Sequence, residues 1–415
     1  MKRKFVLVLL FCVTIFSIYF ATSIESSVYY ESALKSTIPL NFFGMHIHRA
    51  TTTTPWPKIT FGSWRLWQAD ITWAYLEPEK GKWNFATLDK YVELAEKNEV
   101  EILLVLGQTP TWASARPTEK AVYGKGFGAE PKNIEDWRNY VRTVAERYKG
   151  KIRYYEIWNE MHLKMFYTGT VEKMVELSRE AYKIIKDVDS SNVVVSPSSG
   201  GQNVGLSVLE EFLEKGGGSW ADILSYHFYV NPEPPEAMVE LIEGVKNIIA
   251  GHNLENKPLW NTEAGWFKPK PFPSDRLGAA YVARSYILNW ARGVRRFYWY
   301  AWDNIQFMSL HTVEPDFKTL KPAAIAYEEV RKWLVGAKMT YCQSDSQKTW
   351  TCKLTRDGDY TAYVIWNPNE QLNFQIPQDW QVKEVRDLEG ASQKFHDAKS
   401  VEIGPLPLLL EDVVS

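Results

Sequence analysis

Eight short apolar segments alternate with amphipathic stretches between about residues 41 and 330, and this alternation restricts the possible folds more than any other feature. Parallel strands need long crossover connections, so strands that alternate with helices are typical of a parallel sheet. One such helix is indicated by apolar residues at three- and four-residue steps after the capping residue Asn133, namely Ile134, Trp137, Val141, Val144 and Tyr148. The eight units predict an α/β fold, a (β/α)₈ TIM barrel over 41–330. We expect its strands at 41–47, 62–67, 101–107, 152–158, 192–196, 222–227, 257–262 and 295–301.

The pattern changes after about residue 331. Segments 349–355 and 360–366 flank Asp357-Gly358, which is a strong hairpin signal. Strands are also expected at 382–386 and 400–403, the last of them at a sheet edge because Pro405 and Pro407 follow it. Residues 331–415 therefore predict a small β-sandwich that packs against the barrel, with an independent sugar-binding module as the alternative. Residues 24–40 form a linker that could add a strand to it.

The N-terminal segment predicts export. Three basic residues in Met1-Lys2-Arg3-Lys4 precede an apolar run from Phe5 to Ala21, and Ala21-Thr22-Ser23 fits a small-residue cleavage site. We favour a signal peptide over residues 1–23, and a retained anchor over residues 5–21 is the alternative. Either interpretation places the remaining chain outside the cytoplasm, secreted or otherwise extracytoplasmic, with membrane contact only if the segment is uncleaved.

Two cysteines remain once Cys12, inside the apolar run, is set aside. Cys342 and Cys352 could face each other across a hairpin with its turn at 343–347, and a close pair outside the cytoplasm usually forms a disulfide.

Composition excludes some partners. The formal net charge is −2, with 48 basic and 50 acidic residues and no basic block, which argues against nucleic acid. The chain has 18 Trp and 22 Tyr. Such aromatic residues fit either carbohydrate binding or core packing.

Two glutamates stand where two expected strands end. Strand 152–158 leads into Trp158-Asn159-Glu160, and strand 257–262 leads into Glu263. Barrel enzymes carry their catalytic groups at the C-terminal ends of strands. Cleavage of a glycosidic bond needs one protonated and one ionised carboxyl group on opposite sides of the anomeric carbon. The sequence therefore predicts a pair of catalytic acids.

This arrangement resembles clan A of the glycoside hydrolases, most closely family 39 and related bacterial exopolysaccharide-cleaving barrels. The resemblance covers about residues 41–330, with one departure: Met161-His162 follow Glu160, where members often have Pro. It implies that Glu160 is the acid/base and Glu263 the nucleophile of a retaining glycosidase, with the two carboxyl groups roughly 5–5.5 Å apart. The other residues that it implies at the site are Asn159 on the 2-hydroxyl, Arg65 holding Glu263 ionised, His227 and Tyr229 against the sugar and the nucleophile, and Trp302 as the floor of the subsite.

Further candidates for the cleft are His46, Gln108 and Trp266. His46 and His48 could instead chelate a metal, as in metal-dependent hydrolases, but that interpretation leaves Asn159 and Glu263 without a role. We expect a polysaccharide or oligosaccharide substrate and no cofactor or metal. The rival function is a non-catalytic carbohydrate-binding barrel in polysaccharide secretion or biofilm formation.

Overall fold

The computed structural model describes residues 36–395 and 399–413. The predicted signal peptide or anchor, and residues 24–35 of the predicted linker, lie outside this range. In the described part of the chain, no helix combines the length and apolar character needed to cross a membrane.

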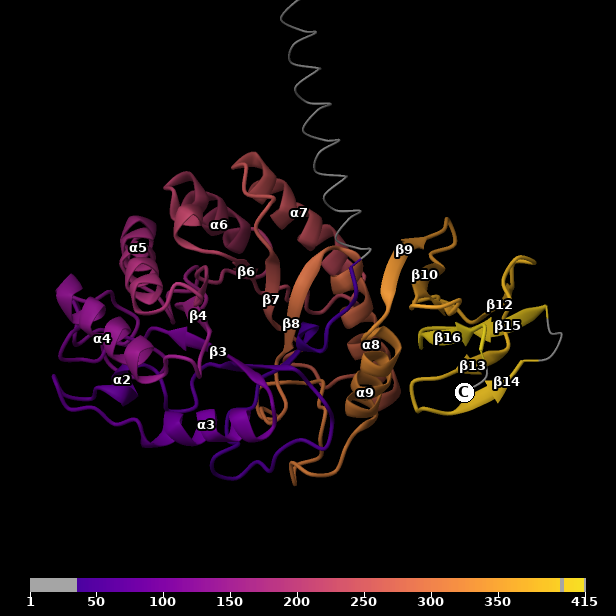
Figure 1. Cartoon of the computed structure of the whole chain (residues 1–415), viewed down its shortest axis with the longest axis horizontal. Helices are drawn as coiled ribbons and strands as arrows, with labels where there is room; N and C mark the ends of the chain where they lie inside the picture. The colour runs from indigo at the N-terminus through magenta and orange to yellow at the C-terminus, as the bar shows by residue number, and fades with distance from the viewer. Residues whose placement is uncertain (1–35, 396–398, 414–415) are drawn as a thin grey trace, which may run out of the picture.

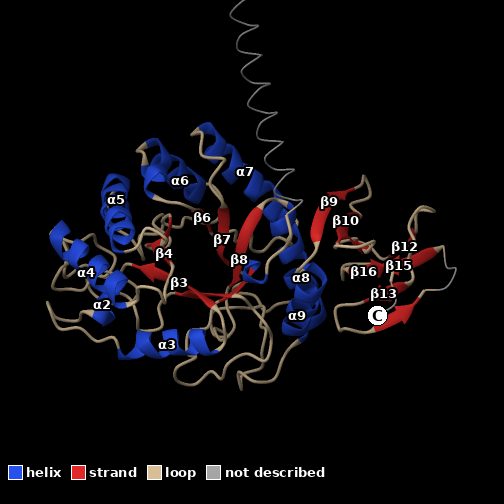
Figure 2. Cartoon of the chain, in the orientation of Figure 1, coloured by secondary structure: helices blue, strands red, loops and turns tan. Residues whose placement is uncertain are grey.

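Eight parallel strands form the predicted barrel (Figures 1 and 2), in the order β5-β4-β3-β2-β1-β8-β7-β6. Isolated parallel bridges, Val195 with Ile223 and Gly200 with His227, join the two ends of this sheet and close it. Each strand starts and ends within about three residues of its expected position. The strands are β1 (Phe43–Met45), β2 (Ser63–Leu66), β3 (Glu101–Leu106), β4 (Tyr154–Ile157), β5 (Val193–Val195), β6 (Leu224–Tyr226), β7 (Leu259–Ala264) and β8 (Val294–Trp299).

Helices surround the strands and cover their outer faces (Figure 2). Three of them begin at a side-chain cap that satisfies a free first-turn N–H: Asn133 accepts from the N–H of Glu135, as expected from the sequence, Thr170 from that of Lys173 and Ser274 from that of Leu277. The helices are α2 (Trp73–Leu76), α3 (Ala86–Lys97), α4 (Ile134–Arg147), α5 (Val171–Val188), α6 (Val204–Glu214), α7 (Ala237–Gly251), α8 (Asp275–Ala291) and α9 (Pro322–Leu334), with short 3₁₀ turns η1 (Leu40–Phe42) and η2 (Gly217–Trp220).

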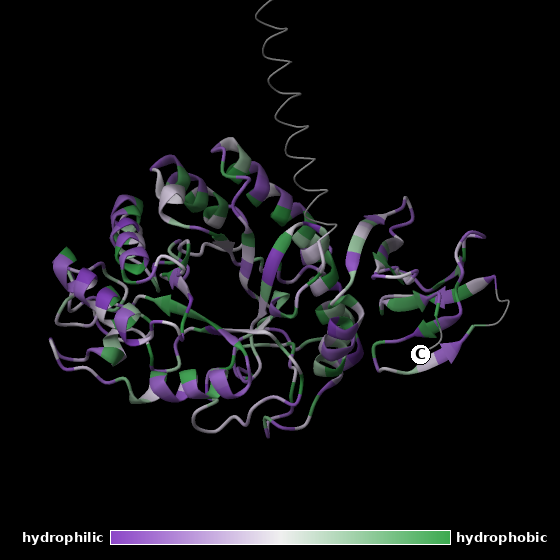
Figure 3. Ribbon diagram, in the orientation of Figure 1, coloured by the Kyte–Doolittle hydropathy of each residue, from purple (hydrophilic) through white to green (hydrophobic). Residues whose placement is uncertain are grey.

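The barrel interior is filled in layers. At the N-terminal end of the strands, Tyr154, Trp260 and Tyr298 pack together, and the guanidinium carbon of Arg296 lies 4.3 Å from the ring centroids of Tyr154 and Trp260. Above this plug the interior becomes polar, with a buried Arg65 and Glu156. Apolar colour marks β3 while the outer helices alternate in colour (Figure 3), as expected of a parallel sheet buried on both faces. The packed lower half thus confines any open site to the C-terminal end.

The remaining strands form the predicted β-sandwich, beside α8 and α9 (Figure 1). A six-stranded antiparallel sheet, in the order β14-β13-β16-β11-β10-β9, faces the two-stranded sheet β12-β15 across a core that includes Tyr363, Ile403 and Leu410. The strands are β9 (Lys338–Ser344), β10 (Trp350–Thr355), β11 (Thr361–Trp366), β12 (Leu372–Gln375), β13 (Glu384–Arg386), β14 (Ser392–Lys394), β15 (Ser400–Ile403) and β16 (Leu408–Glu411).

Two details of this region differ from or extend the prediction. Strand β15 pairs with β12 alone and so lies at a sheet edge, as predicted, but the sequence did not predict β16, which follows Pro405 and Pro407 and pairs with both β11 and β13. From the linker, Thr37 forms an antiparallel bridge with Lys338 at the start of β9. The predicted disulfide is confirmed, because Cys342 and Cys352 are bonded across the paired strands β9 and β10.

We expect replacement of both cysteines by serine to destabilise the β-sandwich by about 2–3 kcal/mol, since a bridge between residues ten positions apart restricts the unfolded chain. Thermal unfolding of wild type, with and without dithiothreitol, measures the same loss independently. Unfolding of the double variant and of the reduced wild type at the temperature of the oxidised protein would show that the disulfide does not stabilise the β-sandwich.

Candidate active site

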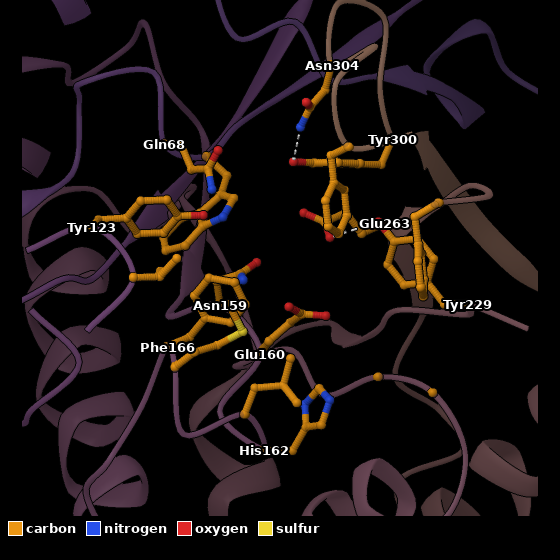
Figure 4. A pocket seen from close by; sticks show the side chains of 18 residues that line it. Gln68, Tyr123, Asn159, Glu160, His162, Phe166, Tyr229, Glu263, Tyr300 and Asn304 are labelled. Atoms are coloured by element: carbon orange, nitrogen blue, oxygen red, sulfur yellow. Dashed lines mark hydrogen bonds between the residues drawn. The ribbon is translucent and has the colours of Figure 1, made fainter. Parts of the chain in front are cut away.

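A cavity of about 470 Å³ opens at the C-terminal end of the barrel strands (Figure 4). Glu160, Asn159, Glu263 and Tyr229 all line it, so the structure brings together side chains from the ends of β4, β6 and β7. One carboxylate oxygen of Glu160, one of Glu263 and a ring nitrogen of His227 lie within 4.8 Å of one another. The two predicted acids therefore share one cavity.

Glu263 reaches the cavity because β7 is irregular. In a regular strand Thr262 and Glu263 would point to opposite faces. Here the pairing of β7 with β8 shifts between Asn261 and Ala264. Thr262 consequently donates to Glu156 in the barrel interior (Oγ1–Oε1 2.9 Å), while the adjacent Glu263 accepts from Arg65. Bulges of this kind commonly redirect a side chain beside an active site.

Glu160 is placed by an unusual turn after β4. Trp158 and Glu160 both have positive φ, 63° and 44°, a conformation that is costly for residues with a side chain. The turn is fastened by Ser198, whose hydroxyl accepts from the N–H of Glu160 (3.0 Å) and whose carbonyl accepts from the N–H of Met161 (3.0 Å). Strain retained in this way is typical of functional positions.

Arg65 is fully buried beneath the cavity and forms hydrogen bonds to three residues of the site. Its guanidinium donates to Glu263 (Nη1–Oε1 2.9 Å), to Asn159 (Nη2–Oδ1 2.8 Å) and through Nε to Glu156. Thr262 provides a further hydrogen bond to Glu156. A buried guanidinium with two carboxylates has its donors satisfied and its charge compensated.

The two carboxyl groups differ in their surroundings. Burial raises the pKa of Glu160 and that of Glu263. For Glu263 the charge of Arg65 and the hydroxyl of Tyr229 (Oη–Oε2 3.1 Å) oppose this rise in pKa, because both stabilise the ionised form. The charge of Arg65 also lowers the pKa of Glu160, but the hydrogen bonds of its guanidinium among the described residues go to Glu156, Glu263 and Asn159. The arrangement favours a proton on Glu160 and a charge on Glu263.

His227 lies between the two acids. Its Nδ1 is 3.2 Å from Oε1 of Glu160 and 3.4 Å from Oε2 of Glu263. Burial lowers the pKa of His227 to about 3, so its ring is neutral near pH 7. Its Nε2 is buried without a hydrogen-bond partner in the described chain, which favours the tautomer with the proton on Nδ1, since an unmet donor is harder to bury than an unmet acceptor. The ring then donates to Oε1 of Glu160.

Three predicted cleft residues lie elsewhere. Trp302 is 1% exposed and packs in the core; its backbone N–H donates to the carbonyl of His46, and Tyr300 takes the expected place on the cavity wall. Trp266 is buried, and its Nε1 donates to the carbonyl of Glu233. His46 is buried below the wall, 3.0 Å from the carbonyl of Thr262. For Trp266 and His46, a hydrogen bond between the ring and a backbone carbonyl holds the side chain away from the cavity.

The proposed metal pair does not assemble. His46 faces a carbonyl, and His48 Nδ1 lies 3.1 Å from Oδ1 of Asp303, with which it pairs. Within residues 36–395 and 399–413, the one group of three side chains with converging ligand atoms is Glu160, His227 and Glu263. Its carboxylates are already engaged by Arg65 and Tyr229.

Sequence reasoning missed most of the cavity wall. Aromatic side chains supply much of it, and they come from irregular loops where no periodicity fixes the direction of a side chain. The aromatic lining residues are Trp67, Tyr123, Phe166, Tyr229, Phe267, Tyr300 and Phe307. The high content of Trp and Tyr was the available signal, but it did not identify positions.

A closed (β/α)₈ barrel with an acid at the end of its fourth strand and another at the end of its seventh defines a glycosidase-like protein. The sequence profile of the glycosyl hydrolases of family 39 matches residues 64–301, more than half of the chain. The chain belongs to this family.

Individual relatives are distant. A β-xylosidase of Geobacillus stearothermophilus is 25% identical over 229 residues, which cover 49% of this chain and 45% of the relative. An endo-1,4-β-xylanase A of Halalkalibacterium halodurans is 30% identical over 95 residues, 21% of this chain and 24% of the relative. The chain thus spans less than half the length of these curated relatives.

Solved structures share the fold. A family 39 glycoside hydrolase of Bacteroides cellulosilyticus superposes with a TM-score of 0.72 at 21% identity, covering 90% of this chain and 80% of the other. A family 39 β-xylosidase of Caulobacter crescentus gives a TM-score of 0.65 at 18% identity, covering 91% and 97%.

Replacing Arg65 by Met should lower the free energy of unfolding by about 3–5 kcal/mol, because it leaves the carboxyl groups of Glu156 and Glu263 buried without their cation. Guanidinium chloride titration measures this change. Arg142 is a matched control: its ion pairs are exposed, and Arg142→Met should cost less than about 1 kcal/mol. If Arg65→Met and Arg142→Met lowered the free energy of unfolding equally, Arg65 would not be the cation that stabilises the two buried carboxylates.

Proposed function

We propose that this protein is a retaining glycosidase that cleaves β-linked sugars by double displacement, with Glu160 as acid/base and Glu263 as nucleophile. The observation that carries the proposal is the approach of the two carboxylates, with one oxygen of each within 4.8 Å across one cavity. Retaining enzymes hold their acids about 5–5.5 Å apart, whereas inverting enzymes separate them by roughly 6.5–9.5 Å to admit a water molecule.

In the first step the ionised carboxylate of Glu263 attacks the anomeric carbon as Glu160 gives its proton to the departing oxygen. A glycosyl ester on Glu263 results. In the second step Glu160 removes a proton from water, the resulting hydroxide attacks the anomeric carbon, and the carboxylate of Glu263 is released. Asn159 lines the cavity with its side chain held by Arg65, so it is positioned to hydrogen-bond a sugar hydroxyl.

The names of two relatives suggest a narrower substrate class than sugars in general. Two curated relatives carry the names β-xylosidase and endo-1,4-β-xylanase, so we propose β-linked xylose-containing glycans as first candidates. Aromatic faces along the cavity suit the C–H faces of pyranose rings. We further propose action outside the cytoplasm, in keeping with the basic and apolar N-terminal segment and with a disulfide that needs an oxidising compartment.

Conversion of either acid to its amide tests the chemistry. On aryl β-xylosides and a panel of other aryl β-glycosides, Glu263→Gln should reduce kcat by about 10⁴-fold or more, since the attacking group is lost. Glu160→Gln should cost about 10²–10⁴-fold, least with leaving groups that need no proton. Exposed Glu210 on α6 provides a control, and Glu210→Gln should retain full activity.

Binding of oligosaccharides without turnover on any substrate would instead support the carbohydrate-binding alternative. A rate lost on chelation and restored by zinc would revive the metal interpretation.

The pH profile separates the two roles. The acidic limb of kcat/KM follows ionisation of Glu263 and the alkaline limb follows loss of the proton from Glu160. In Tyr229→Phe the hydroxyl that stabilises the charge on Glu263 is gone, so its pKa rises and the acidic limb should move upward by roughly 0.5–1 pH unit. A downward shift of the acidic limb, or movement of the alkaline limb alone, would indicate that the roles of Glu263 and Glu160 are the reverse of those proposed.

A further inference from the structure

A second cavity, of about 310 Å³, adjoins the first on the side of β1, β2 and β3. The two cavities share Gln68, Tyr123 and Asn304 in their walls. Neither glutamate lines the second cavity, and its other walls are mostly polar, including His48 and Gln108. It is therefore a continuation of the cleft away from the reacting bond, and its volume suits a small ligand.

Two buried polar atoms at this cavity have no hydrogen-bond partner in the described chain. Gln108 is 3% exposed; its Oε1 accepts from Thr72 Oγ1 (2.7 Å), which leaves the donor Nε2 unmet. Nδ1 of His48 pairs with the carboxylate of Asp303, which leaves Nε2 without a partner. Burying a polar group without a hydrogen bond costs free energy, so these two nitrogens are expected to hydrogen-bond a ligand in the cavity. A sugar hydroxyl both accepts and donates, and matches the two.

The backbone around the cavity is held in an unfavourable conformation. Gln68, Ala69 and Asp70 have φ values of 63°, 50° and 56°, and Gln108 has 60°. All four residues line the cavity. Non-glycine residues in the left-handed region each cost free energy, and consecutive ones persist where the geometry serves a site.

The position of the acid/base fixes which part of a substrate would enter. The leaving group must lie next to Glu160, which is flanked by His162 and by Gly200, where an added Cβ would lie 3.6 Å from its Oε1. Figure 4 shows His162 beyond Glu160 at one end of the cavity and Gln68 and Asn304 at the other. The second cavity therefore lies on the side opposite the leaving group.

We propose that the second cavity is a sugar subsite for the residue that precedes the cleaved unit on its non-reducing side. The enzyme then recognises at least two consecutive sugars before the broken bond, and acts within chains or releases units longer than one sugar. This inference rests on the proposed function and deepens it.

The test compares aryl β-glycosides of matched length, such as 4-nitrophenyl β-xylobioside and 4-nitrophenyl β-xyloside, or the corresponding pair for whichever sugar the panel identifies. Wild type should show a kcat/KM at least tenfold higher for the disaccharide. Gln108→Met, which removes the unmet donor at similar volume, should reduce that ratio several-fold. Gln343→Met, in the exposed part of β9, is the matched control and should keep the ratio.

Product analysis provides a second measurement that needs no variant. Digestion of a xylohexaose labelled at its reducing end should release disaccharides or longer units from the unlabelled end. Equal kcat/KM for the two aryl substrates together with stepwise release of single sugars would overturn the subsite and leave the proposed chemistry intact. Absence of turnover on every glycoside would refute the proposed function; isothermal titration of xylobiose and xylose into the full chain then decides the subsite, and equal affinity refutes it.

Discussion

The buried guanidinium of Arg65 is the contact on which the site depends. It binds Glu156 in the barrel interior, Glu263 at the cavity and Asn159 beside the acid/base. One cation thus pairs with two buried carboxylates and orients an amide, and without it both carboxylates would be buried with no cation beside them. Structural stability and the electrostatic asymmetry of the two catalytic candidates therefore have the same origin. The asymmetry is what lets two glutamates in one cavity take different roles.

Irregular backbone positions the acids on this rigid base. Regular strands would alternate their side chains, so a shift in β7 pairing is needed to bring Glu263 upward beside Thr262. The left-handed turn at Trp158 and Glu160 does the same for the other acid. The barrel absorbs the cost of such strain because its eight paired strands and their packed interior hold each strand end in place. Loops around the strand ends then shape a cleft with aromatic walls and a polar extension.

The barrel and the positions of both acids could be predicted from sequence, because strand periodicity and a Glu at a strand end depend on local pattern. The cavity walls could not. Trp302 was expected there, yet its side chain is 1% exposed and packs in the core, while Tyr300 lines the cavity. Strand β16 was not predicted either, because nearby prolines normally end a strand, whereas here they precede one. Side-chain direction in loops follows from tertiary contacts, which sequence periodicity does not record.

Trapping the glycosyl-enzyme tests the central claim most directly. A 2-deoxy-2-fluoro aryl glycoside reacts in the first step and stalls before the second, so the nucleophile keeps the sugar. Mass spectrometry of the digested protein should then find the added mass on Glu263 in wild type and find none in Glu263→Gln. A label on Glu160, or steady inversion of the anomeric centre with no labelled carboxylate, would contradict the account.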